Sequence, residues 1–150
     1  MVSSLLFVCL GNICRSPLAE GLAKQYADKH GLVLVIDSCG TGNWHVGEPP
    51  CEDSIRVAKM HGLDISQQRS RQITQKDIER FELIIALDEN NLRDLKAMGA
   101  KNVVKLGDYG YKGEDVPDPY FFPGYEGFEK VYEMIELCVE NLFKSSINPK

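Results

Sequence analysis

The chain has 150 residues, a length that suits one domain spanning residues 1–150 with a continuous apolar core. Its net charge of −5, from 17 basic and 22 acidic residues, argues against nucleic acid as the main partner, because nucleic-acid-binding proteins carry a basic face. No apolar run approaches the roughly 18 residues that a membrane span needs. The N-terminus "MVSSLLFVCLGN" has no basic leader, so we expect a cytoplasmic protein without a membrane partner.

Two strands and a helix are predicted in the first quarter of the chain. Residues 5–9 (LLFVC) form an unbroken apolar run, which is typical of a buried parallel strand. Ser16 is expected to cap a helix with Pro17 at its first position, and Gly31 to end that helix. Residues 32–37 (LVLVID) predict a second strand, which a glycine- and proline-rich loop follows.

The rest of the chain continues the alternation. A helix is expected over 50–61, and Thr74 with Asp77 resembles a capping box that opens a short helix. Residues 83–87 (LIIAL) and 102–106 (NVVKL) read as strands, separated by a helix over 89–98 in which Asp88 is expected to act only as a cap. A final helix carries an apolar stripe formed by Phe128, Val131, Tyr132, Ile135, Val139 and Leu142.

Apolar strands that alternate with helices predict an α/β fold: a three-layer sandwich with a central four-stranded parallel sheet flanked by helices. In such folds ligands bind beyond the carboxyl ends of the strands. Cys9 ends the first predicted strand, so we expect the functional site in the loop that follows it.

The chain has five cysteines, an odd number without a CxxC pair, which argues against a disulfide framework. The three histidines are not spaced with the cysteines as zinc ligands would be, so no metal or other cofactor is expected. We predict Cys39, Cys51 and Cys138 to be buried fillers of the core.

The segment from Cys9 to Arg15 has the pattern C-x5-R, between a buried strand and a helix start. Gly11 and Asn12 tolerate the left-handed backbone of a tight loop, whose inward N–H groups make an anion cradle at the positive end of the helix. Arg15 can grip two phosphate oxygens, and a cysteine in such a field is expected to be the attacking thiolate. The alternative is a Cys9 that only packs in the core. The predicted phosphate-binding residues are Leu10, Gly11, Asn12, Ile13, Cys14 and Arg15.

The motif "VCLGNICRSPLAE", together with "DPYF" far downstream, resembles the low-molecular-weight protein tyrosine phosphatase family. The resemblance also covers "IDSCGTGNWHVGEPP", "SRQIT" and "LDENNLRDL". By itself, Asp118 in "VPDPYFFPG" would read as part of an Asp-Pro turn. The resemblance instead implies that Asp118 is the general acid, while Cys9 is the nucleophile that forms a phosphocysteine and Arg15 stabilises the transferred phosphoryl group.

The resemblance also implies roles around the loop. Trp44, Tyr120 and Phe121 are expected to line a slot for phosphotyrosine, with Leu10 and Ile13 beside them. Ser16 and Ser38 match positions that brace the loop, and Ser16 is expected to contact the Cys9 thiolate. Gln68 stands where relatives often have a histidine that supports the asparagine of the loop.

Cys14 leaves two interpretations open. In the resembled family a second cysteine in the loop can trap an oxidised nucleophile as a disulfide, which here would join Cys14 to Cys9. Alternatively, Cys14 is a small loop residue that offers only its backbone N–H.

Three other functions are alternatives to a protein-tyrosine-phosphatase. An arsenate reductase of the same fold would need further cysteines after the third strand, and residues 83–98 contain none. A cysteine phosphocarrier of sugar transport would need neither Arg15 nor Asp118, and a binding module without turnover would not need the full catalytic set. The expected partners are therefore a phosphotyrosine-containing protein or peptide and inorganic phosphate as product, with the chain acting as a monomer.

Overall fold

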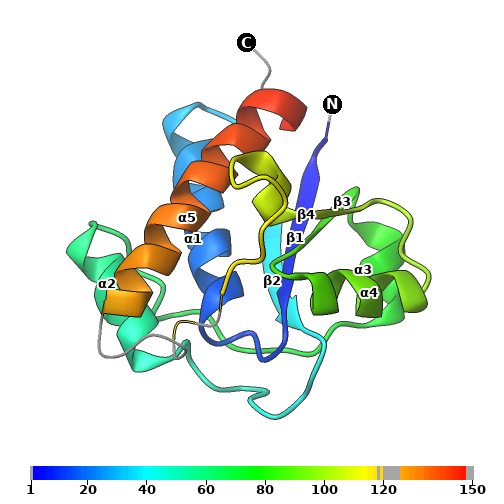
Figure 1. Cartoon of the computed structure of the whole chain (residues 1–150), viewed down its shortest axis with the longest axis horizontal. Coiled ribbons are helices and arrows are strands. Elements are labelled where there is room, and N and C mark those ends of the chain that lie inside the picture. Colours follow the sequence, from blue (N-terminus) through cyan, green and yellow to red (C-terminus); the bar gives the residue numbers. More distant parts are fainter. Residues whose placement is uncertain (1, 118, 120–125, 148–150) are drawn as a thin grey trace.

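The computed structural model describes residues 2–117, 119 and 126–147. Its centre is a four-stranded, fully parallel sheet in the order β2-β1-β3-β4 (Figure 1), which confirms the predicted fold class. The strands are short, with three to six residues each. They are β1 (Ser4–Cys9), β2 (Val35–Gly40), β3 (Leu83–Ala86) and β4 (Val103–Lys105).

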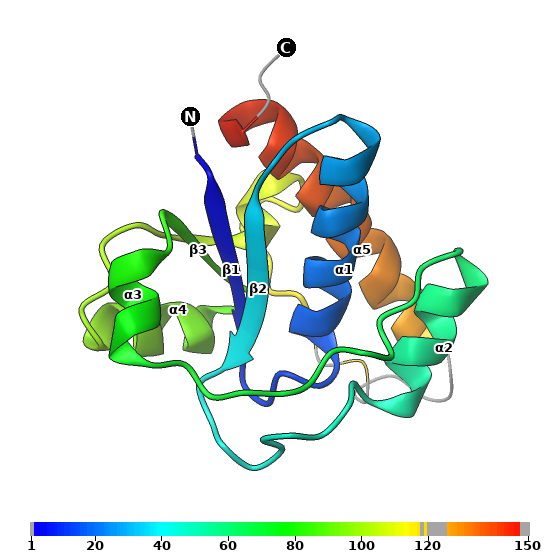
Figure 2. The ribbon, with the colours of Figure 1, turned by 180° about the vertical axis from the view of Figure 1, so that it is seen from behind.

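Helices cover both faces of the sheet, as Figures 1 and 2 show from opposite sides. One face carries α1 (Arg15–Lys29) and α5 (Glu126–Leu142), with α2 (Glu52–Met60) beside them. The other face carries α3 (Gln75–Arg80) and α4 (Glu89–Ala97). A 3-10 turn η1 (Leu106–Tyr109) follows β4, and a π-helical turn η3 (Phe143–Ile147) extends α5. No helix in the described part of the chain is long and apolar enough to cross a membrane.

From Leu5 to Cys9, strand β1 is apolar because both of its faces are buried. Leu5, Phe7 and Cys9 belong to the core under α1 and α5, whereas Leu6 and Val8 belong to the core under α3 and α4. Side chains alternate between the two faces of a strand, so a strand with a core on each side must be hydrophobic at every position.

The strand register brings the segments that follow the strands to one edge of the sheet. Cys9 is level with Gly40 at the end of β2, and Val8 is level with Ala86 at the end of β3. The bridge between Gly40 and Gln72 adds the segment before α3 to the same edge. Four stretches that are distant in sequence therefore meet beyond Cys9.

Three predicted starts are wrong by two residues or more, those of α1, β2 and α2, and α2 begins at Glu52 rather than at Pro50. The cap of α1 is Cys14 rather than Ser16, whose hydroxyl contacts the loop instead. Strand β2 begins three residues later than predicted, because the Leu32 N–H donates to Ala27 O and so finishes the end of α1. The Thr74–Asp77 capping box and the positive φ of Gly31, just past α1, are as predicted.

Candidate active site

The Cys9 sulfur lies at the floor of the loop between β1 and α1. It accepts a hydrogen bond from the Asn12 backbone N–H at 3.2 Å and lies 3.0 Å from Ser16 Oγ. Ser16 Oγ in turn accepts a hydrogen bond from Asn12 Nδ2, which leaves its own proton to donate to the sulfur. Two donors therefore point at Cys9, an arrangement that suits a sulfur anion.

Asn12 holds the loop in its strained conformation. Its φ of 57° lies in the left-handed region, which an asparagine adopts at lower cost than most residues. Its side chain makes three hydrogen bonds. Nδ2 donates to Ser16 Oγ at 2.8 Å and to Ser38 Oγ at 2.9 Å, and Oδ1 accepts from the Arg71 N–H at 3.1 Å. The sheet, α1 and the segment before α3 thus clamp one residue of the loop.

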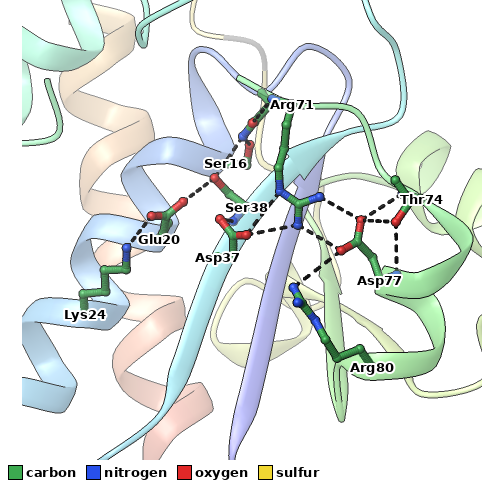
Figure 3. A network of polar contacts seen from close by, with 10 residues as sticks. Ser16, Glu20, Lys24, Asp37, Ser38, Arg71, Thr74, Asp77 and Arg80 are labelled. Carbon is green, nitrogen blue, oxygen red and sulfur yellow. Dashed lines mark hydrogen bonds and ion pairs between the residues drawn. The ribbon is translucent and has the colours of Figure 1, made fainter. Parts of the chain in front are cut away.

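Two clusters of charged residues support the partners of Asn12 (Figure 3). The Ser38 hydroxyl donates to Glu20 at 2.6 Å, and Lys24 pairs with the same carboxylate at 2.7 Å. Arg71 binds Asp77 with two nitrogens, at 2.8 and 3.1 Å, and also pairs with Asp37. Burial opposes the charge of Asp77, but hydrogen bonds from Arg71 and Thr74 outweigh it and lower the pKa of Asp77 below 3.8.

Arg15 is the first residue of α1, and its side chain is held by residues that follow β3 and β4. Its Nη1 lies 2.7 Å from Asp88 Oδ2 and donates to Val116 O at 3.0 Å. Asp88 also caps α4 by accepting the Asn91 N–H at 2.8 Å, as predicted for a cap. Sequence reasoning missed its contact with Arg15, because no local pattern links a loop after β1 to a helix start after β3.

A cavity of about 230 Å³ opens above the loop. It is lined by Cys9, Leu10, Gly11, Ile13, Cys14, Arg15, Trp44 and His45. Cys9 is only 2% exposed, so it contributes the floor, whereas Trp44 and Leu10 are 67% and 48% exposed and form the rim. His45 was not singled out from the sequence; its ring packs over Gly11, where a Cβ would lie 3.1 Å from His45 Cδ2.

The other cysteines differ in their surroundings. Cys39 and Cys138 are buried in the core, as predicted. Cys51 is not a buried filler, because it is partly exposed, caps α2 and places its sulfur 2.6 Å from that of Cys14. Gln68 donates to Pro17 O at 3.0 Å, and the described contacts that support Asn12 come from Ser16, Ser38 and Arg71 instead.

Three predicted site residues, Asp118, Tyr120 and Phe121, lie outside the described residues. Every other predicted site residue either belongs to the loop from Cys9 to Arg15, braces it or stands at the rim of its cavity. Within residues 2–117, 119 and 126–147, no group of three or more histidine, cysteine, aspartate or glutamate side chains could hold a metal ion.

Comparison with known proteins adds independent information. The family model "Low molecular weight phosphotyrosine protein phosphatase" matches residues 4–150. The low molecular weight protein-tyrosine-phosphatase YfkJ of Bacillus subtilis is 40% identical, over 95% of this chain and 94% of its own. The pig low molecular weight phosphotyrosine protein phosphatase is 34% identical, over 92% of each chain.

Two solved structures have the same fold as this chain. The crystal structure of YfkJ superposes with a TM-score of 0.89 over 100% of this chain and 98% of that one, at 36% identity in the structural alignment. A Drosophila arginine phosphatase superposes with a TM-score of 0.90 over the whole of both chains, at 33% identity. The chain belongs to the low molecular weight phosphotyrosine protein phosphatase family.

Proposed function

We propose that this protein hydrolyses phosphotyrosine, through a phosphocysteine formed on Cys9 in the loop from Cys9 to Arg15. The observation that carries the proposal is the position of the Cys9 sulfur. It is the floor of a cavity that Arg15 also lines, with donors from Asn12 and Ser16 directed at it. Such an arrangement stabilises a thiolate and offers it an anionic substrate.

In the first step the thiolate attacks the phosphorus of the bound ester. A sulfur–phosphorus bond forms as the phosphorus–oxygen bond to tyrosine breaks, and the carboxyl group of Asp118 gives its proton to the departing phenol oxygen. The loop N–H groups and the Arg15 guanidinium bind the three equatorial oxygens, whose charge they stabilise in the transition state.

In the second step water attacks the phosphocysteine. The Asp118 carboxylate now accepts a proton from that water, the sulfur–phosphorus bond breaks and inorganic phosphate leaves, which restores the Cys9 thiolate. Ser16 serves both steps, because its hydroxyl stabilises the sulfur anion that attacks in the first step and the sulfur anion that leaves in the second. In this mechanism Cys9, Arg15 and Asp118 complete the cycle without a cofactor.

The path of the chain supports the role of Asp118. The Val116 carbonyl accepts a hydrogen bond from Arg15, so the chain passes beside the loop two residues before Asp118. Two residues span less than about 8 Å, so the position of Val116 is compatible with the proposed role of Asp118. The pairing of Val116 N–H with Leu87 O fixes this segment against the end of β3.

The rim of the cavity favours an aromatic leaving group. Trp44 and Leu10 are exposed apolar side chains that line the cavity, where they can cover a phenol ring. The relatives named as tyrosine phosphatases agree with this substrate, whereas the similar arginine phosphatase makes phosphoarginine the alternative to test. We further propose that the chain acts as a monomer in the cytoplasm.

Release of p-nitrophenol from its phosphate ester, with a phosphotyrosine peptide in parallel, tests the mechanism. Replacement of the nucleophile in Cys9→Ser should abolish turnover. Asp118→Ala should slow hydrolysis of the peptide by about 10²–10⁴-fold. The loss should be smaller for p-nitrophenyl phosphate, whose leaving group needs little protonation. Asp94→Ala, an exposed aspartate on α4, is the matched control and should retain activity.

The same assay separates the alternatives. Full turnover by Cys9→Ser would overturn the mechanism, and faster hydrolysis of phosphoarginine than of phosphotyrosine would overturn the substrate. Consumption of arsenate with a thiol donor, without phosphatase turnover, would instead assign the loop to an arsenate reductase. Trapping of ³²P-labelled phosphocysteine by rapid acid quench gives direct evidence for the covalent intermediate.

A further inference from the structure

Two cysteines from different parts of the chain meet beside the phosphate loop. Cys14 caps α1 and Cys51 caps α2, and their sulfurs are 2.6 Å apart although 37 positions separate them in sequence. A disulfide bond is about 2.05 Å long, so closing one here requires the sulfurs to approach by only about 0.5 Å. Ser54 Oγ lies 3.0 Å from Cys51 Sγ and completes the cluster.

The backbone on both sides holds this pair in place. The Cys51 N–H donates to Ile13 O at 2.7 Å, and the Ser54 hydroxyl donates to Cys14 O at 3.0 Å. The start of α2 is thus already fastened to the loop by two hydrogen bonds that flank the sulfurs. A covalent bond between the two sulfurs would add a third connection between the loop and the start of α2, and it would leave the loop in its present shape.

Exposure separates this pair from the remaining cysteines. Cys14 and Cys51 are partly exposed, whereas Cys9, Cys39 and Cys138 are buried. Burial also raises the pKa of Cys138, to about 11, and that of Cys39 further, which keeps both as inert thiols. An oxidant from solution therefore meets this partly exposed pair before it meets the core cysteines Cys39 and Cys138.

We propose that Cys14 and Cys51 form a reversible disulfide, a redox modification site of this chain, with hydrogen peroxide as the oxidant. One sulfur attacks the peroxide, the oxygen–oxygen bond breaks, and a sulfenic acid and one water result. The second sulfur attacks the sulfenic sulfur, the sulfur–oxygen bond breaks, and the hydroxide leaves as a second water. Each peroxide thus takes two electrons from the two thiols, and an external dithiol reverses the reaction.

This pairing differs from the Cys9–Cys14 disulfide that the family resemblance implies. Cys51 competes for Cys14 from a position already in sulfur contact, and the Cys14–Cys51 bond consumes no catalytic group. The oxidised protein should therefore keep its nucleophile as a thiol. In a chain without Cys51, oxidation should instead pass to Cys9 and inactivate the enzyme.

Peptide mapping tests the proposal without relying on activity. The full chain is treated with limiting hydrogen peroxide, alkylated, digested without reductant and analysed by mass spectrometry. We expect a cross-linked peptide pair containing Cys14 and Cys51, with Cys9 alkylated. The cross-link should disappear after dithiothreitol and in Cys51→Ser, and persist in Cys138→Ala. A Cys9–Cys14 cross-link in the wild type, or no cross-link at all, would overturn the proposal.

A second measurement follows the rate of inactivation by peroxide, each protein being compared with its own initial rate. We expect Cys51→Ser to lose p-nitrophenyl phosphatase activity faster than the wild type, and Cys138→Ala to match the wild type. Equal inactivation of Cys51→Ser and wild type would contradict the protective effect. Because the mapping needs no turnover, failure of the phosphatase mechanism would leave the test of the disulfide intact.

Discussion

At the scale of single residues, the site depends on how closely the sheet approaches the loop. Gly40 ends β2 level with Cys9, and a Cβ at this position would lie 2.7 Å from Leu10 O and 3.1 Å from the Gly11 carbonyl carbon. Both are backbone atoms, which cannot rotate away. Only a glycine lets the loop rest on the end of β2 in this way.

Gly40→Ala is therefore expected to displace the loop and lower kcat/KM of p-nitrophenyl phosphate hydrolysis by a large factor. Gly31→Ala is the control: it has open space for a Cβ but a φ of +64°, so it should reduce stability and leave kcat/KM unchanged. Steady-state kinetics and thermal unfolding of both variants distinguish the two effects. Normal kcat/KM in Gly40→Ala would show that the loop tolerates a shift of its support.

Asp88 is the residue whose contact most directly controls Arg15. Asp88→Asn keeps a good cap for α4 but removes the charge that lies 2.7 Å from the guanidinium. Loss of a charged hydrogen bond costs about 1.5–3 kcal/mol, which corresponds to a ten- to hundred-fold lower kcat/KM when the contact orients Arg15 for the transition state. Asp94→Asn on the same helix is the control and should leave kcat/KM unchanged. A normal kcat/KM in Asp88→Asn would show that Asp88 acts only as a helix cap.

At the scale of elements, α3 contributes to the site through its capping box. Asp77 accepts hydrogen bonds from the Thr74 backbone and side chain and from Arg71, whose own N–H supports Asn12. The start of one short helix is thereby linked through Arg71 to the strained residue of the loop. Asp77 has a structural role for α3 and a supporting role for the catalytic loop.

Asp77→Asn should lower the free energy of unfolding by about 1.5–3 kcal/mol at neutral pH. The pKa of Asp77 is lower in the folded protein than in the unfolded chain, so its carboxylate stabilises the fold above its unfolded pKa of about 3.9. That advantage is lost as the pH falls through the folded pKa. Urea unfolding of wild type and variant should therefore show a gap in unfolding free energy near pH 7 that narrows as the pH falls below the unfolded pKa, and a gap independent of pH would contradict the ion pair.

The sequence predicted the elements better than the contacts between them. Apolar runs predicted all four strands, although β2 lies three residues further along the chain than predicted, and Thr74 with Asp77 located α3, because these signals are local. The partners of Asn12 and Arg15 depend on which strand ends meet and on how side chains point, which no single stretch of sequence encodes. The contact between Cys14 and Cys51 was missed for the same reason, since it joins the caps of two helices.

At the scale of the whole molecule, an anion in the loop should stabilise the entire fold. The loop gathers support from β2, α1, α4 and the segment before α3, so occupation of the cavity can be felt throughout the domain. A ligand at one hundred times its Kd adds about 2.7 kcal/mol to the free energy of unfolding. The binding of the product can therefore be followed by stability alone.

Inorganic phosphate above its Kd should raise the thermal unfolding midpoint with the logarithm of its concentration, and chloride at equal ionic strength should not. Cys9→Ser should respond as well, because the cradle of N–H groups remains. Arg15→Lys should respond much less, since an ammonium group lacks the planar fork that binds two oxygens. An identical shift in Arg15→Lys would show that the loop backbone alone accounts for phosphate binding.

Strand β1 is hydrogen-bonded on both sides, to β2 and to β3, and it carries the nucleophile at its end. A refolding chain cannot shape the loop until both neighbours have joined, which requires contacts between residues about 30 and 80 positions apart. Recovery of enzymatic turnover after dilution from denaturant should thus lag behind helix formation and report the completion of the sheet.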